Sequence, residues 1–216
     1  MIDLSNIEKY KENNRIEAKK ATGGLPKSLW ETYSAFANTL GGVILLGVEE
    51  YPDKTLHPVD LPDTDWMLSD LRDGLSDPAV VSVNILSEDD VQVQTVEGKR
   101  IIVITVPRAA RSQKPVYIGG DPYSGSYFRN GEGDYRCTAE DVQAMLRGAS
   151  SDPHYHAGPD GIIDCLTENV SVTLSELSRL LDRDPKALRP ILAQLLDEKV
   201  IVEDEEPGEP IYRLRA

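Results

Sequence analysis

A short segment rich in proline and glycine divides this chain of 216 residues into a longer and a shorter part. Residues 152–159 read Asp-Pro-His-Tyr-His-Ala-Gly-Pro, a composition typical of a linker because proline and glycine do not continue helices or strands. Each part must then bury a core of its own. We predict one domain at residues 1–150, a linker at 151–159 and a second domain at 160–216.

The first part alternates helical and strand patterns, which predicts an α/β (α+β) domain built on a mixed sheet. Apolar residues recur at helical spacing from Pro26 to Leu40 and over residues 64–75, and Thr138 is suited to cap a helix from Ala139 to Leu146. Strands are expected at residues 14–21, 43–48, 81–85, 91–95, 101–106, 115–118 and 125–129.

The second part predicts three short helices followed by a two-stranded ribbon. Thr173-Leu-Ser-Glu176 matches a capping box, and Asp184-Pro185 places a capping residue before a proline at the first helical position. The helices are expected at residues 160–168, 173–181 and 185–199, and the strands at 200–202 and 211–214. This order describes a winged helix-turn-helix domain, whose third helix enters the DNA major groove.

The charge of the chain is concentrated in its middle. The formal net charge is -14, and residues 47–90 hold twelve acidic and two basic residues. This composition excludes a protein that coats nucleic acid through overall basic charge, but it leaves the flanking segments of the first domain free to present cations. We interpret the central stretch as solvated loops and a solvated helix face.

Cysteine, histidine and apolar patterns exclude several other classes of protein. The two cysteines and three histidines lack the spacing of a disulfide framework or a zinc site. The longest apolar run, residues 43–48, is too short to span a membrane, and the chain does not begin with a basic and then apolar leader. We expect a soluble cytoplasmic protein.

Several motifs of the first domain occur in an order that resembles the Schlafen AlbA-type domain. They are Glu12-Asn-Asn-Arg-Ile-Glu-Ala-Lys19, Leu25-Pro26, Ala35-Phe-Ala-Asn-Thr-Leu-Gly-Gly42, Leu46-Gly-Val-Glu-Glu50 and Tyr127-Phe-Arg-Asn-Gly131. The likeness covers about residues 8–147. In bacteria such domains are commonly assigned to DNA binding and are often followed by helix-turn-helix regions. The resemblance therefore implies a DNA-binding protein similar to transcriptional regulators.

Within these motifs, Asn38 precedes a pair of glycines that leads into an apolar strand. We expect its amide to satisfy the carbonyl groups at the end of the preceding helix, and the glycines to permit positive φ. The segment lacks the Gly-Lys-Ser/Thr of a P-loop, so a nucleotide site of that kind is not expected.

Lysine and arginine side chains are the candidates for binding nucleic acid, because they position phosphates without reading bases. The candidates are Arg15, Lys19, Lys27, Arg108, Arg111, Lys114 and Arg129 in the first domain, and Lys186 and Arg189 in the predicted third helix of the second. The predicted wing, residues 203–209, carries five carboxylates and no cation and would repel phosphate. The second domain therefore fits DNA binding and protein contact equally well. A homodimer is expected, because two-fold symmetric sites suit such modules.

Two alternatives to DNA binding remain open. Some members of the resembled family cut RNA with clustered carboxylates and a divalent metal, and Glu12, Glu17 and either Glu49 or Glu50 match the positions of those carboxylates. Such a cluster would hold Mg²⁺ or Mn²⁺ and activate water, acting on RNA or single-stranded DNA; otherwise no cofactor is expected. The acidic wing and the acidic central stretch favour a third hypothesis, a protein-interaction module. We favour binding over catalysis.

Overall fold

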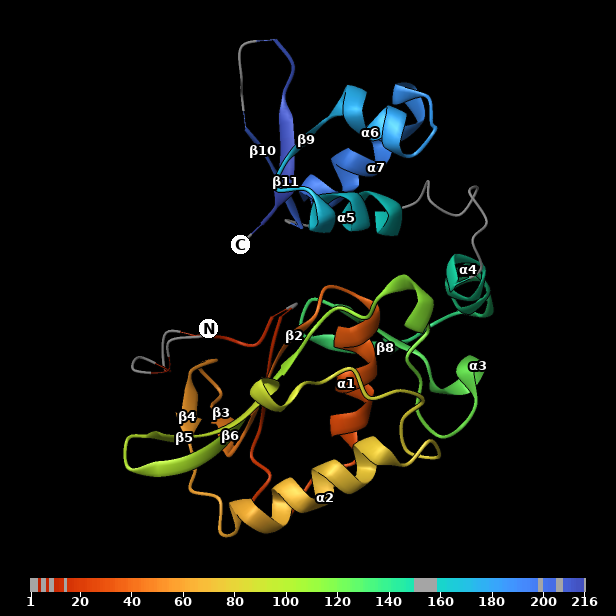
Figure 1. Cartoon of the computed structure of the whole chain (residues 1–216). Coiled ribbons are helices and arrows are strands. Elements are labelled where there is room, and N and C mark those ends of the chain that lie inside the picture. Colours follow the sequence, from red (N-terminus) through yellow and green to blue (C-terminus); the bar gives the residue numbers. More distant parts are fainter. Residues whose placement is uncertain are drawn as a thin grey trace. The chain divides into compact units, whose positions relative to one another are not determined.

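The computed structural model describes residues 4, 7, 10–13, 15–149, 159–197, 200–204 and 208–215. It divides the chain into two compact units, Met1–Ala149 and Ser150–Ala216 (Figure 1). The linker predicted at 151–159 lies outside the described residues, except for Pro159, which begins a helix. No helix within the described ranges is long and apolar enough for a membrane crossing.

A four-stranded mixed sheet forms the centre of the first unit. Its strands follow the order β1 (Ile16–Lys19), β2 (Gly42–Leu46), β6 (Lys99–Val106) and β5 (Val91–Val96). Strands β1 and β2 are parallel, whereas the other neighbours are antiparallel. The mixed α/β architecture predicted for this part of the chain is confirmed.

Both faces of this sheet pack against other elements. Alternate side chains of a strand point to opposite faces, so one strand contributes to two cores. Ile44 and Leu46 of β2 pack in one core with α1 (Ser28–Asn38) and α2 (Thr64–Ser76). Leu45 packs in a second core with the hairpin of β3 (Val48–Glu50) and β4 (Leu56–Pro58). The unit also contains α3 (Pro122–Gly125), β7 (Tyr127–Asn130), β8 (Gly133–Arg136), α4 (Ala139–Ala149) and two short 3-10 helices, Glu88–Asp90 and Arg111–Gln113.

Helices with clear capping residues form where the sequence predicts them. The Asp63 side chain accepts a hydrogen bond from Trp66 N at 2.9 Å and begins α2. Thr138 and Asp141 exchange the hydrogen bonds of a capping box at the start of α4. The three helices predicted for this unit are therefore confirmed as α1, α2 and α4.

Two predicted strands, at residues 81–85 and 115–118, are wrong. These segments contribute only isolated bridges, including Val81 to Ile118. Their backbone groups are bonded largely by side chains: the Tyr33 hydroxyl accepts from Ile85 N, and the Asn38 carboxamide bonds both N and O of Val116. A partner strand is therefore not needed to satisfy them.

The strand expected at 43–48 is divided in two by Gly47. This glycine has φ +84°, and a Cβ there would lie 2.8 Å from Leu61 Cγ and 2.9 Å from Val59 O. Its own carbonyl accepts a hydrogen bond from Val59 N. The chain turns at this position because only glycine fits the conformation and the close contact.

Within the described residues, the second unit contains three helices and a three-stranded antiparallel sheet of order β10-β11-β9. Its elements are α5 (Pro159–Glu168), β9 (Val172–Thr173), α6 (Leu174–Leu180), α7 (Pro185–Asp197), β10 (Ile201–Asp204) and β11 (Ile211–Leu214). The predicted capping box of Thr173 and Glu176 is confirmed, whereas strand β9 was not expected. Residues 205–207 of the expected wing and Lys199 lie outside the described residues.

Candidate nucleic-acid interface

Three cations from two segments that are distant in the sequence donate to successive carbonyl groups at the end of α1. Lys114 Nζ donates to Asn38 O at 2.7 Å, Arg108 Nε to Thr39 O at 2.9 Å, and Arg15 Nη2 to Leu40 O at 3.5 Å. The last carbonyl groups of a helix have no partner within it and carry partial negative charge. Cations at this position therefore satisfy those groups.

A fourth cation, Arg111, lies in the segment that carries Arg108 and Lys114. On one side of it Ala109 N donates to Ala37 O at 2.8 Å, and on the other Lys114 bonds Asn38 O, so the segment follows the last turn of α1. Arg15 is exposed, and Arg108 and Arg111 are half-buried. We call Arg15, Arg108 and Arg111 the arginine cluster. Arg15 and Arg108 meet at the end of α1 through their bonds to Leu40 O and Thr39 O, and Arg111, whose Nη2 atom is buried, lies in the same segment as Arg108.

Asn38 joins the end of α1 to two other segments of the chain. Its Nδ2 donates to Val116 O at 2.8 Å and to Tyr127 O at 3.0 Å, and its Oδ1 accepts from Val116 N at 2.8 Å. The expectation that its amide serves the carbonyl groups of its own helix is therefore wrong. The expected positive φ is confirmed at Gly41, where it is +72°. Asn38 ties α1 to two segments about eighty residues away, which no local pattern could indicate.

Three predicted phosphate-binding residues are committed to bonds inside the unit. Lys114 is 5% exposed, and the Arg129 side chain is 1% exposed. Lys19, whose side chain is 9% exposed, binds Glu17 Oε1 at 2.9 Å and Ser28 Oγ at 3.2 Å. We therefore remove Lys19, Lys114 and Arg129 from the predicted phosphate-binding surface, because their charged groups face protein oxygens rather than solvent.

Arg129 is the most extensively bonded cation among the described residues. Its guanidinium donates to Glu17 Oε2 and Asp134 Oδ1, each at 2.8 Å, and to the carbonyl oxygens of Asn13 and Ile16 at 3.0 and 3.3 Å. These bonds join β1, β7 and β8 through one buried side chain. The residue predicted to bind phosphate therefore links three strands.

Lys27 is exposed but lies at the other end of α1 from the arginine cluster. Eleven residues of helix separate the two ends, which is about 16 Å at 1.5 Å per residue. Arg15, Lys19 and Lys27 therefore do not form a single cationic edge.

In the second unit, Lys186 and Arg189 are both exposed on α7. The described carboxylates of the β10–β11 ribbon have partners within the unit. Asp204 pairs with Arg213 at 2.6 Å, Glu203 accepts from the Tyr212 hydroxyl at 2.9 Å, and Glu209 accepts from Ser175 N and Oγ. Burial and the Glu203 contact raise the pKa of Tyr212 to about 12. The ribbon thus remains acidic, although its described carboxylates form hydrogen bonds or ion pairs within the unit.

The predicted acidic residues are only partly brought together. Glu12, Glu17 and Glu50 interact: burial raises the pKa of Glu12 most, the carboxylates of Glu17 and Glu50 raise it further, and a hydrogen bond from Ala18 N opposes the shift. Glu49 instead pairs with Lys20 at 3.0 Å, because successive residues of β3 face opposite sides. Strand geometry therefore places Glu50, rather than Glu49, with the carboxylates of Glu12 and Glu17.

These carboxylates do not fit a divalent cation in this arrangement. Glu17 is paired with Lys19 and Arg129, and Glu50 Oε2 pairs with Lys54 at 3.0 Å. Within the described residues, no group of three or more His, Cys, Asp and Glu side chains could hold a metal ion. Glu50 Oε1 is buried and has no hydrogen-bond partner among the described residues.

Comparison with known protein families gives a match within the first unit. The family model described as Schlafen, AlbA_2 matches residues 12–138, and no curated protein matches the chain. A similar solved structure is the N-terminal domain of a protein described as related to the ATP-dependent DNA helicase RecG, from Nitrosomonas europaea, with 32% identity over 64% of this chain and 95% of that chain and a TM-score of 0.46. Another is the DIP2311 protein of Corynebacterium diphtheriae, with 21% identity over 64% of this chain and 25% of that one and a TM-score of 0.43.

Proposed function

This chain belongs to the Schlafen AlbA_2 family, and on that premise we propose that it binds nucleic acid, as a DNA-binding protein similar to transcriptional regulators. The observation that carries the proposal is the arginine cluster, in which Arg15 and Arg108 bond carbonyl groups at the end of α1 and Arg111 follows Arg108 by three residues. Arginine is well suited to such a role because its planar group presents several donors to phosphate oxygens.

The second unit supports a second point of contact. We propose that it is a winged helix-turn-helix in which α6 and α7 form the helical pair and β10 and β11 form the wing. Exposed Lys186 and Arg189 would then approach the DNA from α7, while the acidic ribbon stays away from phosphate. Two copies of the chain would read a two-fold symmetric site, so a homodimer belongs to this proposal.

A titration of the whole chain against labelled DNA tests the proposal. The DNA is a 30-base-pair duplex of mixed sequence, and anisotropy is measured at about 50 and 200 mM salt, because phosphate contacts are strongest at low salt. Binding at 50 mM that weakens steeply at 200 mM is expected. The absence of binding at 50 mM would refute the proposal, and tighter binding of an RNA hairpin of equal length would redirect it to RNA.

The role of α7 has its own test. Lys186→Gln and Arg189→Gln should each weaken DNA binding several-fold, since each removes an exposed cation from the proposed recognition helix. Arg213→Gln is a matched control, because it removes one cation that is already paired with Asp204. Equal effects of the three variants would indicate a general charge effect and would leave α7 without a specific role.

A divalent-metal nuclease is the second candidate function. It is favoured by the electrostatic interaction of Glu12 with Glu17 and Glu50, although these residues do not fit a metal as they are arranged here. Structured RNA and single-stranded DNA are incubated with the chain and Mn²⁺, alongside Glu12→Gln and Glu17→Gln variants. Cleavage by the wild type that both variants lose would support the nuclease; no cleavage, or cleavage that persists in both, would reject this site.

A further inference from the structure

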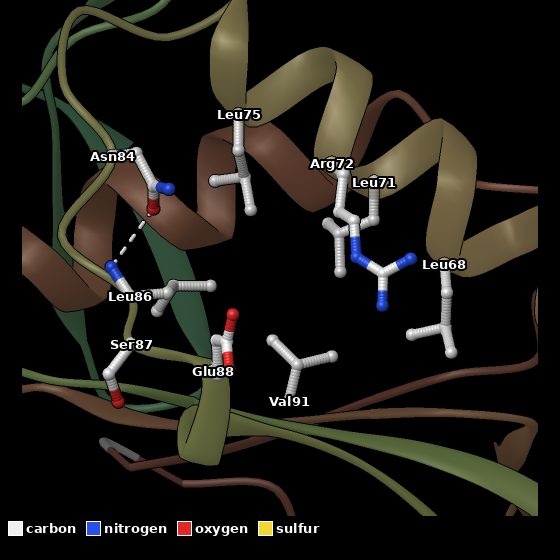
Figure 2. A pocket seen from close by; sticks show the side chains of 9 residues that line it. All are labelled: Leu68, Leu71, Arg72, Leu75, Asn84, Leu86, Ser87, Glu88 and Val91. Atoms are coloured by element: carbon white, nitrogen blue, oxygen red, sulfur yellow. Dashed lines mark hydrogen bonds between the residues drawn. The ribbon is translucent and has the colours of Figure 1, made fainter.

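The acidic central stretch of the chain contributes to a feature that nucleic-acid binding does not explain. A cleft of about 430 Å³, lined by five aliphatic and four polar or charged side chains, lies between α2 and the segment that leads into β5 (Figure 2). Such a volume lies within the range of ligand-binding pockets. The cleft is lined by Leu68, Leu71, Arg72, Leu75, Asn84, Leu86, Ser87, Glu88 and Val91.

The two walls of the cleft are held by local hydrogen bonds. On the α2 side, the Asp63 cap fixes the first turn of the helix. On the other side, Asn84 Oδ1 accepts from Leu86 N at 3.0 Å, and Asp90 accepts from Ser87 N and Oγ at 2.7 and 2.6 Å. The cleft is therefore formed before anything binds, which lowers the entropic cost of binding.

Two charged side chains of opposite sign point into this cleft. Figure 2 shows Arg72 descending from α2 and Glu88 rising from the facing segment, with leucine side chains between and around them. Neither side chain has a hydrogen bond or an ion pair with any residue that the structure describes. Their charged groups are therefore available to a bound molecule.

The charge around the cleft determines what kind of molecule suits it. Residues 60–90 contain nine carboxylates and a single cation, Arg72. Glu88 lines the cleft, Asp89 and Asp90 follow it directly, and Asp65 lies one turn before Leu68 on α2. This field repels nucleic acid and other anions and attracts cations. Aliphatic side chains within an acidic surround are complementary to an amphipathic segment that carries lysine or arginine.

We propose that the cleft between α2 and residues 84–91 docks a short cationic, amphipathic segment of another protein. Aliphatic side chains of the segment fill the space between Leu68, Leu75 and Leu86. A lysine or arginine beside them pairs with Glu88. Arg72 donates to a backbone carbonyl oxygen of the docked segment. This site is separate from the arginine cluster and does not depend on DNA binding.

A defined peptide tests the proposal on the whole chain. The probe is a labelled, amidated 14-residue peptide with leucine at positions i, i+3, i+4 and i+7 and lysine elsewhere, and its counterpart carries glutamate in place of every lysine. We expect the lysine peptide to bind with micromolar affinity, measured by anisotropy, and the glutamate peptide not to bind. No binding of the lysine peptide, or equal binding of both peptides, would overturn the proposal.

Variants distinguish docking in the cleft from attraction to an acidic surface. Glu88→Gln should weaken binding of the lysine peptide about threefold, in line with one exposed ion pair. Asp73→Asn is the matched control, because Asp73 is an exposed residue of α2 that does not line the cleft, and less than a 1.5-fold effect is expected, that being a small fraction of one exposed pair. Equal effects of the two substitutions would overturn the proposal.

The aliphatic contact is tested with Leu86→Ser, which should weaken binding about tenfold by removing buried apolar surface. Val91→Thr changes the same cleft with little change of volume and provides a second variant if Leu86→Ser does not fold. The lysine peptide binding both folded variants as tightly as the wild type would also overturn the proposal. DNA binding should be unchanged in these variants, which separates this site from the proposed nucleic-acid interface.

Discussion

Replacing Arg129 by alanine should destabilise the first unit more than any other loss of a single surface or half-buried charge. The side chain is 1% exposed and donates to two carboxylates and two carbonyl oxygens. Its removal leaves Glu17 and Asp134, each 13% exposed, without their main partner. Breaking a buried charge network of this kind costs about 3–5 kcal/mol in free energy of unfolding.

The two tryptophans make this loss measurable for the first unit alone. Trp30 and Trp66 both lie in that unit, so urea unfolding followed by tryptophan fluorescence reports its stability and not that of the second unit. Arg129→Ala should lower the unfolding free energy by about 3–5 kcal/mol and the Tm by roughly 6–20 °C. Arg129→Lys keeps the charge but not the planar fork and should lie between alanine and the wild type.

A double-mutant cycle with Glu17→Gln separates the ion pair from general packing. Because Glu17 Oε2 and Arg129 Nη2 are 2.8 Å apart, the two substitutions should couple by about 1–3 kcal/mol. A loss below about 1 kcal/mol in Arg129→Ala, the level of an exposed ion pair, would refute the structural role assigned to this arginine.

Three further predictions concern single residues of the first unit. Asn38→Ala should lower its unfolding free energy by about 3 kcal/mol, because Val116 N and Tyr127 O lose their bond to Asn38, whereas Val116 O keeps the Ser34 hydroxyl; urea unfolding with a loss below about 0.5 kcal/mol would contradict this. Gly47→Ala should cost about 1–3 kcal/mol in the same assay, and more than Gly98→Ala, which has a similar φ and open space around it. The pKa of Glu12 is raised in the folded state, so its contribution to stability is greatest below pH 4.5 and is lost as pH rises through the folded pKa. Glu12→Gln should therefore raise stability at pH 7 by about 0.5 kcal/mol, allowing for solvent screening, with less gain at pH 4.5; lower stability at pH 7 would contradict the sign.

The sequence predicts the helices of both units well because the signals that begin them are local. Asp63 and Thr173 each accept from a backbone N–H three residues later, within the reach of a short pattern. The strand predicted at 115–118 fails for the opposite reason. The groups of Val116 that would join a sheet are bonded by Asn38, 78 residues earlier in the chain.

In the candidate site, too, local patterns are read from the sequence and contacts between distant residues are not. The sequence indicates candidate cations but cannot tell which of them are buried, because burial depends largely on segments that are remote in the chain. Lys114 bonds an oxygen 76 residues earlier in the chain, and Arg129 bonds Glu17, 112 residues earlier, as well as Asp134, five residues later. The acidic cleft could not be predicted from the sequence either, because it forms only when α2 packs beside residues 84–91.

The measurement that tests the nucleic-acid proposal most directly is the salt dependence of DNA binding in variants of the arginine cluster. Arg15→Gln combined with Arg111→Gln removes two cations from the cluster, and Lys20→Gln combined with Lys54→Gln removes two exposed cations that pair with Glu49, Glu50 and Glu132. The cluster variant should reduce the slope of log K against log salt by about 2 for duplex DNA, and the control should leave it nearly unchanged. Equal slopes for wild type and cluster variant, or no DNA binding by the wild type at low salt, would contradict the proposal.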